Sequence, residues 1–253
     1  MEELLGDAAI RGDLESLHSI IAKDNYILDK ILVGSFKWKN SLHQAISTGQ
    51  VEYVQNLLEI KPQLAEVVDV ELGAALHIAS TNGDLKIVEA LVELSPEMCM
   101  ARDRDGNNPL HIAVMKGKVN VLKKLVQTCP HAAQVIVDRG DTILHLCVNY
   151  NQLESLQLLL EMIGDPEFPH SWDVNGNIIL HIAVFSKRPD IVRYVLNSTE
   201  INVNAFNEVG WTTMDIYFFV QNRHREEVDP CIQNLLDAAR AKRRLHMLVL
   251  TPS

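Results

Sequence analysis

Hydrophobic side chains recur along this chain at the spacing of amphipathic α-helices. In four stretches, apolar residues are separated by three, three and one positions, which places them on one face of a helix. These positions are Val51, Val54, Leu57, Leu58; Leu85, Val88, Leu91, Val92; Val119, Leu122, Leu125, Val126; and Leu153, Leu156, Leu159, Leu160. The pattern predicts four amphipathic helices that bury equivalent faces.

A Leu-His motif precedes each of these helices, and a further copy follows the fourth. The histidines are His43, His77, His111, His145 and His181, at steps of 34, 34, 34 and 36 residues. The two additional residues of the last step fall in the segment 164–172, which we expect to form a longer loop. A fixed period of this length is typical of a solenoid.

Glycines keep the same phase as the histidines. Gly106, Gly140, Gly176 and Gly210 each stand five residues before the position that His111 holds in its repeat, and Asp215 occupies that position in a degraded last copy. Each repeat is therefore predicted to contain a Gly-containing turn, a short helix, a break and a longer amphipathic helix. The side chains that could cap the short helices are Asn108, Thr142 and Thr212.

The repeat resembles the ankyrin repeat, whose signature is T-P-L-H-x-A. The stretch that matches it best runs from Asp103 through Gly106 and Pro109-Leu110-His111 to Ala113. The resemblance implies an all-α solenoid of stacked helix pairs with short β-turn fingers. We expect about seven repeats in a domain over residues 1–235, including an N-terminal cap and the degraded last repeat, followed by a basic tail over residues 236–253.

Two stretches are more specifically similar to a group of plant ankyrin proteins that carry a C-terminal membrane domain called PGG. They are LLGDAAIRGDLESL at residues 4–17 and VNAFNEVGWTTMDI at residues 203–216. This sequence ends at Ser253 without such a domain. The resemblance implies an adaptor in defence or stress signal transduction. A second hypothesis is a soluble or truncated form of a membrane-tethered signalling protein.

The regular histidines raise the alternative of a metal protein or an enzyme. Helices of neighbouring repeats pack about 10 Å apart, whereas zinc ligands lie about 2 Å from the metal, so equivalent histidines cannot share one ion. We expect His43, His77, His111, His145 and His181, together with the four turn glycines, to specify the fold. No catalytic motif is present, and we expect no enzyme activity, cofactor or metal site.

Charge and cysteine usage narrow the class of partner. The chain has 23 basic and 33 acidic residues, a net charge of −10, which disfavours general nucleic-acid binding. The four cysteines form no C-x-x-C pair, and the segment after Met1 lacks a secretory pattern. We therefore expect reduced thiols, a protein partner and a cytoplasmic location, with the inner face of the plasma membrane as a further possibility.

In ankyrin proteins, partners contact the turn tips and the exposed side of the first helix of each repeat. By phase, the turn positions in this chain are Phe36, Lys37, Arg104, Asp105, Asn107, Arg139, Asp141, Asn177 and Trp211, and the helix positions are Met115, Lys116, Tyr150 and Phe185. Aromatic and Met side chains are enriched among interface anchors. For Trp211 and Phe185, packing between adjacent repeats is an equally open alternative.

Basic residues gather near the C-terminus, at Arg240, Lys242, Arg243 and Arg244. This cluster could contact an anionic membrane peripherally or act in nuclear import. A solvated helix end is the simpler alternative. The apolar run 245–250 is far shorter than the roughly 20 residues that span a bilayer.

Overall fold

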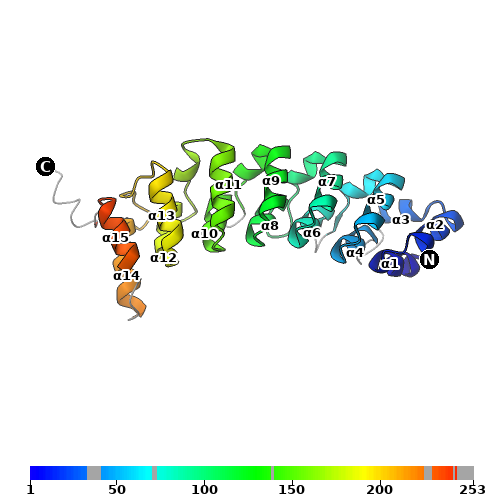
Figure 1. Ribbon diagram of the computed structural model, residues 1–253, viewed down its shortest axis with the longest axis horizontal. Helices are drawn as coiled ribbons and strands as arrows, with labels where there is room; N and C mark the ends of the chain where they lie inside the picture. Colours follow the sequence, from blue (N-terminus) through cyan, green and yellow to red (C-terminus); the bar gives the residue numbers. More distant parts are fainter. Residues whose placement is uncertain (33–40, 70–72, 138–139, 225–229, 242, 244–253) are drawn as a thin grey trace. The chain divides into compact units, whose positions relative to one another are not determined.

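The computed structural model describes residues 1–32, 41–69, 73–137, 140–224, 230–241 and 243. These residues form two compact units, Met1–Ala133 and Gln134–Ser253. Each unit is built from pairs of helices that are consecutive in the chain, and the two helices of a pair contact each other (Figure 1). This architecture confirms the all-α solenoid of stacked helix pairs.

In its described part, the first unit contains four helix pairs and one additional short helix. The pairs are α1 (Glu2–Arg11) with α2 (Leu14–Lys23), α4 (Ser41–Ser47) with α5 (Val51–Ile60), α6 (Ala75–Asn82) with α7 (Leu85–Leu94), and α8 (Pro109–Met115) with α9 (Val119–Thr128). The additional helix, α3 (Ile27–Leu32), follows the first pair and has no counterpart in the periodic pattern.

In the described part of the second unit there are three pairs. They are α10 (Ile143–Asn149) with α11 (Leu153–Ile163), α12 (Ile179–Phe185) with α13 (Pro189–Ser198), and α14 (Thr213–His224) with α15 (Pro230–Ala238). Residue 235, where the sequence predicted the end of the repeats, lies within α15.

Equivalent helices of successive repeats pack side by side within each unit. In the first unit α1, α4, α6 and α8 form one layer, and α5, α7 and α9 form a second layer (Figure 1). In the second unit α10, α12 and α14 are neighbours in the same way, and α13 contacts α15. The inner first helices α4, α6 and α12 are therefore held between their own partners and the equivalent helices of the adjacent repeats.

The hydrophobic core lies where the periodic pattern predicts it. In α5, Val54, Leu57 and Leu58 are buried, and the equivalent residues of α7 and α9 are buried as well. In α11, Leu156 and Leu159 are buried, but Leu160 is only half-buried. The first residue of each predicted set, such as Val51, is only half-buried because it lies at the helix start. Burial of such apolar side chains contributes about 1.5 to 3 kcal/mol each.

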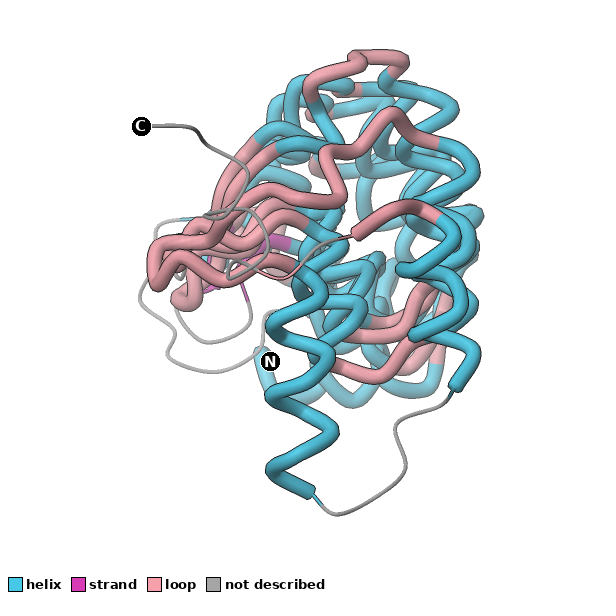
Figure 2. Tube along the Cα trace, turned by 90° about the vertical axis from the view of Figure 1, so that its left-hand side faces the viewer, coloured by secondary structure: helices cyan, strands magenta, loops and turns pink. Residues whose placement is uncertain are grey.

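The segments between repeats leave the helical layers as loops (Figure 2). Three of them begin with a short 3₁₀ helix that starts at a proline, namely η1 (Pro62–Glu66), η2 (Pro96–Met100) and η3 (Pro130–Gln134). In one turn, strand β1 (Val68–Asp69) pairs antiparallel with β2 (Gly73–Ala74). The four turn glycines adopt the positive φ that the sequence predicted, at 76°, 81°, 70° and 75° for Gly106, Gly140, Gly176 and Gly210.

A left-handed residue also ends the first helix of most repeats. Gly49, Gly83 and Gly117 hold this position in the first unit. In the second unit Asn151 and Lys187 take its place, with φ of 56° and 54°. Asn151 and Lys187 thus adopt the same left-handed backbone conformation as the glycines that they replace. For a residue with a side chain this conformation is strained.

Candidate recognition surface

Four of the five repeat histidines, His77, His111, His145 and His181, close the start of their own helix. The Nδ1 atom accepts a hydrogen bond from the backbone N–H three residues earlier, where the helix would otherwise leave a donor unsatisfied. The donors are Ala74 for His77 (3.1 Å), Asn108 for His111 (3.1 Å), Thr142 for His145 (3.4 Å) and Ile178 for His181 (3.1 Å). Asn108 acts as the predicted cap, because its Oδ1 accepts from the His111 N–H at 3.0 Å.

The other ring nitrogen reaches the turn of the following repeat. Because Nδ1 accepts a hydrogen bond, the ring proton of the neutral imidazole is on Nε2, which acts as a hydrogen-bond donor. The acceptors are the backbone carbonyls of Asn107 for His77 (3.1 Å), Asn177 for His145 (2.9 Å) and Ala205 for His181 (3.1 Å). Both nitrogens of these rings therefore form hydrogen bonds within the chain, and the Nε2 bond joins one repeat to the next.

Burial also keeps these rings neutral. It lowers the pKa of His77 and His145 below the usual value, and it lowers the pKa of His181 to about 4. His43 is buried too. A neutral ring with both nitrogens engaged is neither an open metal ligand nor a base exposed to substrate.

The last repeat uses a different side chain at the histidine position. Asp215 Oδ2 accepts from the backbone N–H of Thr212 at 3.1 Å and from its hydroxyl at 2.9 Å, while Thr212 Oγ1 accepts from the Asp215 N–H at 3.2 Å. A carboxylate cannot donate to a further turn. It meets a cation instead, since Arg243 Nε lies 3.6 Å from Asp215 Oδ1 and its guanidinium stacks 4.7 Å from the Phe218 ring centre.

The described residues include no group of three or more His, Cys, Asp or Glu side chains that could hold a metal ion. Burial raises the pKa of the Cys99 thiol to about 12 and raises that of Cys147 as well. Their thiolate fractions at neutral pH are therefore very small, and these two cysteines are poor nucleophiles. None of the helices in the described ranges is long and apolar enough to cross a membrane.

In the first unit, three of the predicted partner-binding residues are exposed, namely Arg104, Asp105 and Lys116. Met115 is half-buried. Asn107 is also half-buried and supports the turn, because its side-chain amide bonds to Asp103 while its carbonyl accepts from His77. Phe36 and Lys37 lie outside the described residues.

In the second unit the predicted helix positions are prominently exposed. Tyr150 is 48% exposed at the end of α10, and Phe185 is 52% exposed at the end of α12. Asp141 and Asn177 are half-buried, and Asn177 Oδ1 accepts from the Asn207 side chain at 2.9 Å. Arg139 lies outside the described residues.

Trp211 packs against a neighbouring side chain and also remains partly exposed. Its ring packs against Phe219 of α14, with centroids 4.9 Å apart, yet it stays half-exposed. Phe219 occupies in its repeat the position that Phe185 occupies in the preceding one, a relation visible in the period but not used in the prediction. We call Tyr150, Phe185, Trp211 and Phe219 the aromatic surface of the second unit.

The turns of the second unit add further exposed apolar side chains. Val174, Phe206 and Val209 are exposed there. Their signal in the sequence was weak, because periodicity fixes which positions lie in turns but not how far each side chain is covered. Exposed apolar side chains on successive turns are typical of interaction sites.

Comparison with known proteins agrees with the geometry. The family model described as Ankyrin repeats (3 copies) matches residues 5–101, 42–135, 93–169 and 110–207. No curated protein matches the sequence. Ankyrin repeats are protein–protein interaction modules, and their fold is a non-catalytic interaction fold.

Three solved structures share the fold at low sequence identity. The ankyrin repeat domain of Bcl-3, a member of the IkappaB protein family, has a TM-score of 0.70 and 20% identity, covering 92% of this chain and 97% of that one. The human ASB11 ankyrin repeat domain gives 0.64 and 19%, with coverage of 91% and 96%. A chain of the complex between the Bdellovibrio bacteriovorus predatory endopeptidase Bd0816 and immunity protein Bd3460 gives 0.64 and 19%, with coverage of 78% and 96%. With the family model matching most of its length, this chain belongs to the ankyrin-repeat family.

Proposed function

We propose that the chain is a non-catalytic adaptor that binds a protein partner through the aromatic surface of the second unit. The observation that carries this proposal is the exposure of Tyr150 and Phe185 on neighbouring first helices, α10 and α12. Large aromatic side chains at such positions lose little conformational entropy on binding and supply much contact area. They are suited to anchor a partner.

The half-exposed pair Trp211 and Phe219 extends this surface to α14, which packs against α12. Mutual stacking fixes both rings before any partner arrives, so ordering them requires less free energy on association. In the first unit, the charged side chains of Arg104, Asp105 and Lys116 are exposed. Such residues contribute mainly to selectivity and association rate.

The test is affinity capture from a native cell extract with a Tyr150→Ala/Phe185→Ala variant beside the unaltered chain. Both residues are exposed, so the variant should keep its circular dichroism spectrum and melting temperature. We expect at least about a tenfold weaker affinity for the captured partner, the size of a typical aromatic hot spot.

A matched control replaces two exposed apolar residues elsewhere, in the variant Tyr26→Ala/Leu94→Ala. This control should bind as tightly as the unaltered chain. Equal capture of every protein by the unaltered chain and the Tyr150→Ala/Phe185→Ala variant would contradict the proposed surface.

The role in defence or stress signalling rests on the similarity of residues 4–17 and 203–216 to plant ankyrin proteins. An adaptor must hold two proteins at once. We therefore expect two captured proteins to enter one complex with this chain in size-exclusion chromatography, and a partner without any signalling activity would count against this role.

The alternative is a soluble or truncated form of a membrane-tethered signalling protein, located in the cytoplasm at the inner face of the plasma membrane. Its support is the basic cluster, of which Arg240 is exposed at the end of α15, whereas Arg243 contacts Asp215 and Phe218. Lys242 and Arg244 lie outside the described residues. Flotation with anionic but not neutral liposomes, lost in Arg240→Gln/Arg244→Gln, would favour this alternative.

A further inference from the structure

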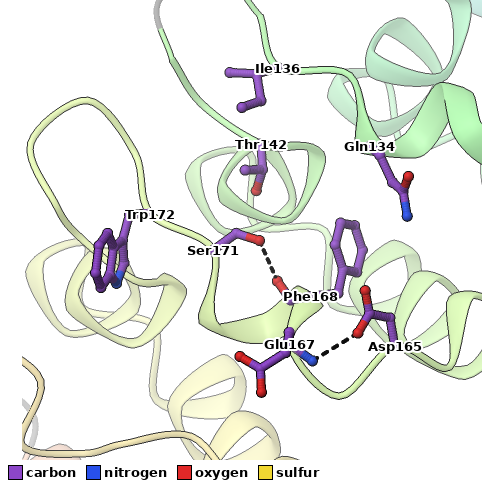
Figure 3. Close-up of a pocket in the computed structure, with 8 residues that line it drawn as sticks. All are labelled: Gln134, Ile136, Thr142, Asp165, Glu167, Phe168, Ser171 and Trp172. Carbon is purple, nitrogen blue, oxygen red and sulfur yellow. Dashed lines mark hydrogen bonds between the residues drawn. The ribbon is translucent and has the colours of Figure 1, made fainter.

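A cavity of about 310 Å³ opens in the second unit (Figure 3). One wall is formed by residues of the segment 134–142, which precedes α10, and the other by residues of the loop between α11 and α12. The lining residues are Gln134, Ile136, Thr142, Asp165, Glu167, Phe168, Ser171 and Trp172. The volume is at the small end of the range for ligand pockets.

The cavity lies in the loop that carries the two additional residues of the period. Gly164 follows the last residue of α11 and has a positive φ of 62°. No atom lies within 4 Å of the position that a Cβ would take there. The following 3₁₀ helix, η4 (Phe168–His170), has three residues, whereas η1, η2 and η3 have five. The altered loop buries Phe168 and leaves Trp172 68% exposed.

Most polar atoms in the walls are already used within the chain. The Thr142 hydroxyl bonds to His145 Nδ1 at 2.8 Å, and the Ser171 hydroxyl donates to the Phe168 carbonyl at 2.8 Å. Asp165 Oδ1 accepts from the Glu167 N–H at 3.0 Å. Neither carboxylate forms an ion pair with any described residue.

The two carboxylates differ in their orientation. Figure 3 shows the Asp165 carboxylate beside the Phe168 ring, whereas Glu167 directs its side chain away from that ring. The Trp172 indole stands at the opposite end of the group. The cavity thus combines an acceptor, apolar walls and an exposed indole.

The surrounding sequence adds a negative field. Residues 161–173, which include the loop between α11 and α12, contain four acidic residues and no Lys or Arg, a net charge of −4. A concave site with charge of one sign concentrates ions of the opposite sign. The field and the cavity walls therefore both favour a cationic group with an apolar stem.

We propose that this cavity binds an arginine side chain presented by a partner protein. The guanidinium donates to Asp165 beside the Phe168 ring, and the methylene stem and peptide backbone extend across the cavity towards the Trp172 indole. Arginine suits the site better than lysine, because its planar, weakly hydrated cation stacks on aromatic rings and donates to carboxylates. None of the lining residues belongs to the aromatic surface, so this site does not depend on the proposed function.

The first experiment is a titration of the full chain with acetyl-Gly-Arg-Gly-amide, followed through the indole N–H signals in ¹⁵N-correlated NMR spectra. Trp172→Phe assigns the signal. We expect a saturable shift of the Trp172 indole with this peptide and none with the citrulline peptide, which has nearly the same shape but no charge. Equal shifts with both peptides, or no shift with either, would overturn the proposal.

Three single substitutions locate the contact. Asp165→Asn removes the charge but keeps an oxygen for the Glu167 N–H, and we expect about tenfold weaker binding. Glu167→Gln should weaken binding less, because its carboxylate points away from Phe168. The matched control is Glu154→Gln, an exposed carboxylate on α11 that does not line the cavity. If Glu154→Gln weakens binding as much as Asp165→Asn, the general field and not the cavity holds the peptide.

Discussion

A single buried histidine links each of several repeats to its successor. In His145, Nδ1 accepts from the Thr142 backbone N–H and Nε2 pairs with the Asn177 carbonyl. Both bonds require the neutral ring with its proton on Nε2. A proton added to Nδ1 would turn that acceptor into a donor facing another donor.

Stability should therefore depend on pH in a defined window. Because the folded-state pKa values of His77, His145 and His181 lie below 6.5, the unfolded chain binds more protons than the folded chain once the pH falls under that value. The histidine contribution is complete above pH 6.5 and is lost as the pH falls towards about 4, where His181 titrates. We expect urea unfolding to give a lower free energy at about pH 5 than at about pH 7.5.

Two variants separate this effect from other titrations. His181→Asn should reduce the difference in unfolding free energy between the two pH values, because one group with a lowered pKa is removed. His18→Gln, at an exposed position of α2, should leave that difference unchanged. A pH-independent unfolding free energy over this window would contradict the assignment of neutral rings.

At the scale of the element, the packing of successive turns in the second unit depends on close backbone contact. The Glu208 N–H donates to the Asn175 carbonyl at 2.9 Å, which joins two successive turns of the second unit. Gly176 makes this approach possible, since a Cβ there would lie 2.8 Å from the Glu208 nitrogen. The glycine serves both the positive φ and the fit between fingers.

We predict that Gly176→Ala destabilises the chain by about 2 to 3 kcal/mol, from backbone strain together with the displaced finger. Gly164→Ala is the matched control, because Gly164 also has a positive φ but nothing lies near its Cβ position. It should destabilise by only about 1 kcal/mol. Chemical denaturation gives both values, and equal losses would show that strain alone matters.

The sequence predicted the helix pairs, the turn glycines and the structural histidines, because all of these repeat with the period. It did not predict α3, which lies outside the period, or the contact of Arg243 with Asp215, which depends on the path of the chain after α15. Whether Trp211 packs or stays exposed was open for a similar reason. Its partner Phe219 is eight residues away, and the choice depends on packing that no local pattern encodes.

At the scale of the whole molecule, each repeat contacts mainly its neighbours. A destabilising substitution should therefore lower stability in its own repeat and the adjacent ones, and have little effect further away. Leu17, in the terminal pair of the first unit, is fully buried, and Leu17→Ala should cost about 2 to 5 kcal/mol locally. We predict faster hydrogen exchange in α1 and α2, with little change in α9. Leu122→Ala, in α9 itself, should accelerate exchange in α9 and in the adjoining α7.

Uniform acceleration throughout Met1–Ala133 in the Leu17→Ala variant would contradict this local distribution. It would mean that the first unit opens as one cooperative body.

The bond from each histidine to the next turn has a direction, and this direction matters while the chain is being synthesised. The ring of His77 pairs with residue 107, that of His145 with 177, and that of His181 with 205, always later in the chain. On the ribosome, a repeat that has just emerged cannot complete its bonds until the next turn has also left the exit tunnel. Asp215 differs, because its carboxylate closes its own helix with Thr212 and its later contact is the side chain of Arg243 instead of a turn. We therefore expect the nascent chain to mature one repeat behind synthesis, and the last repeat to be completed once Arg243 has left the exit tunnel.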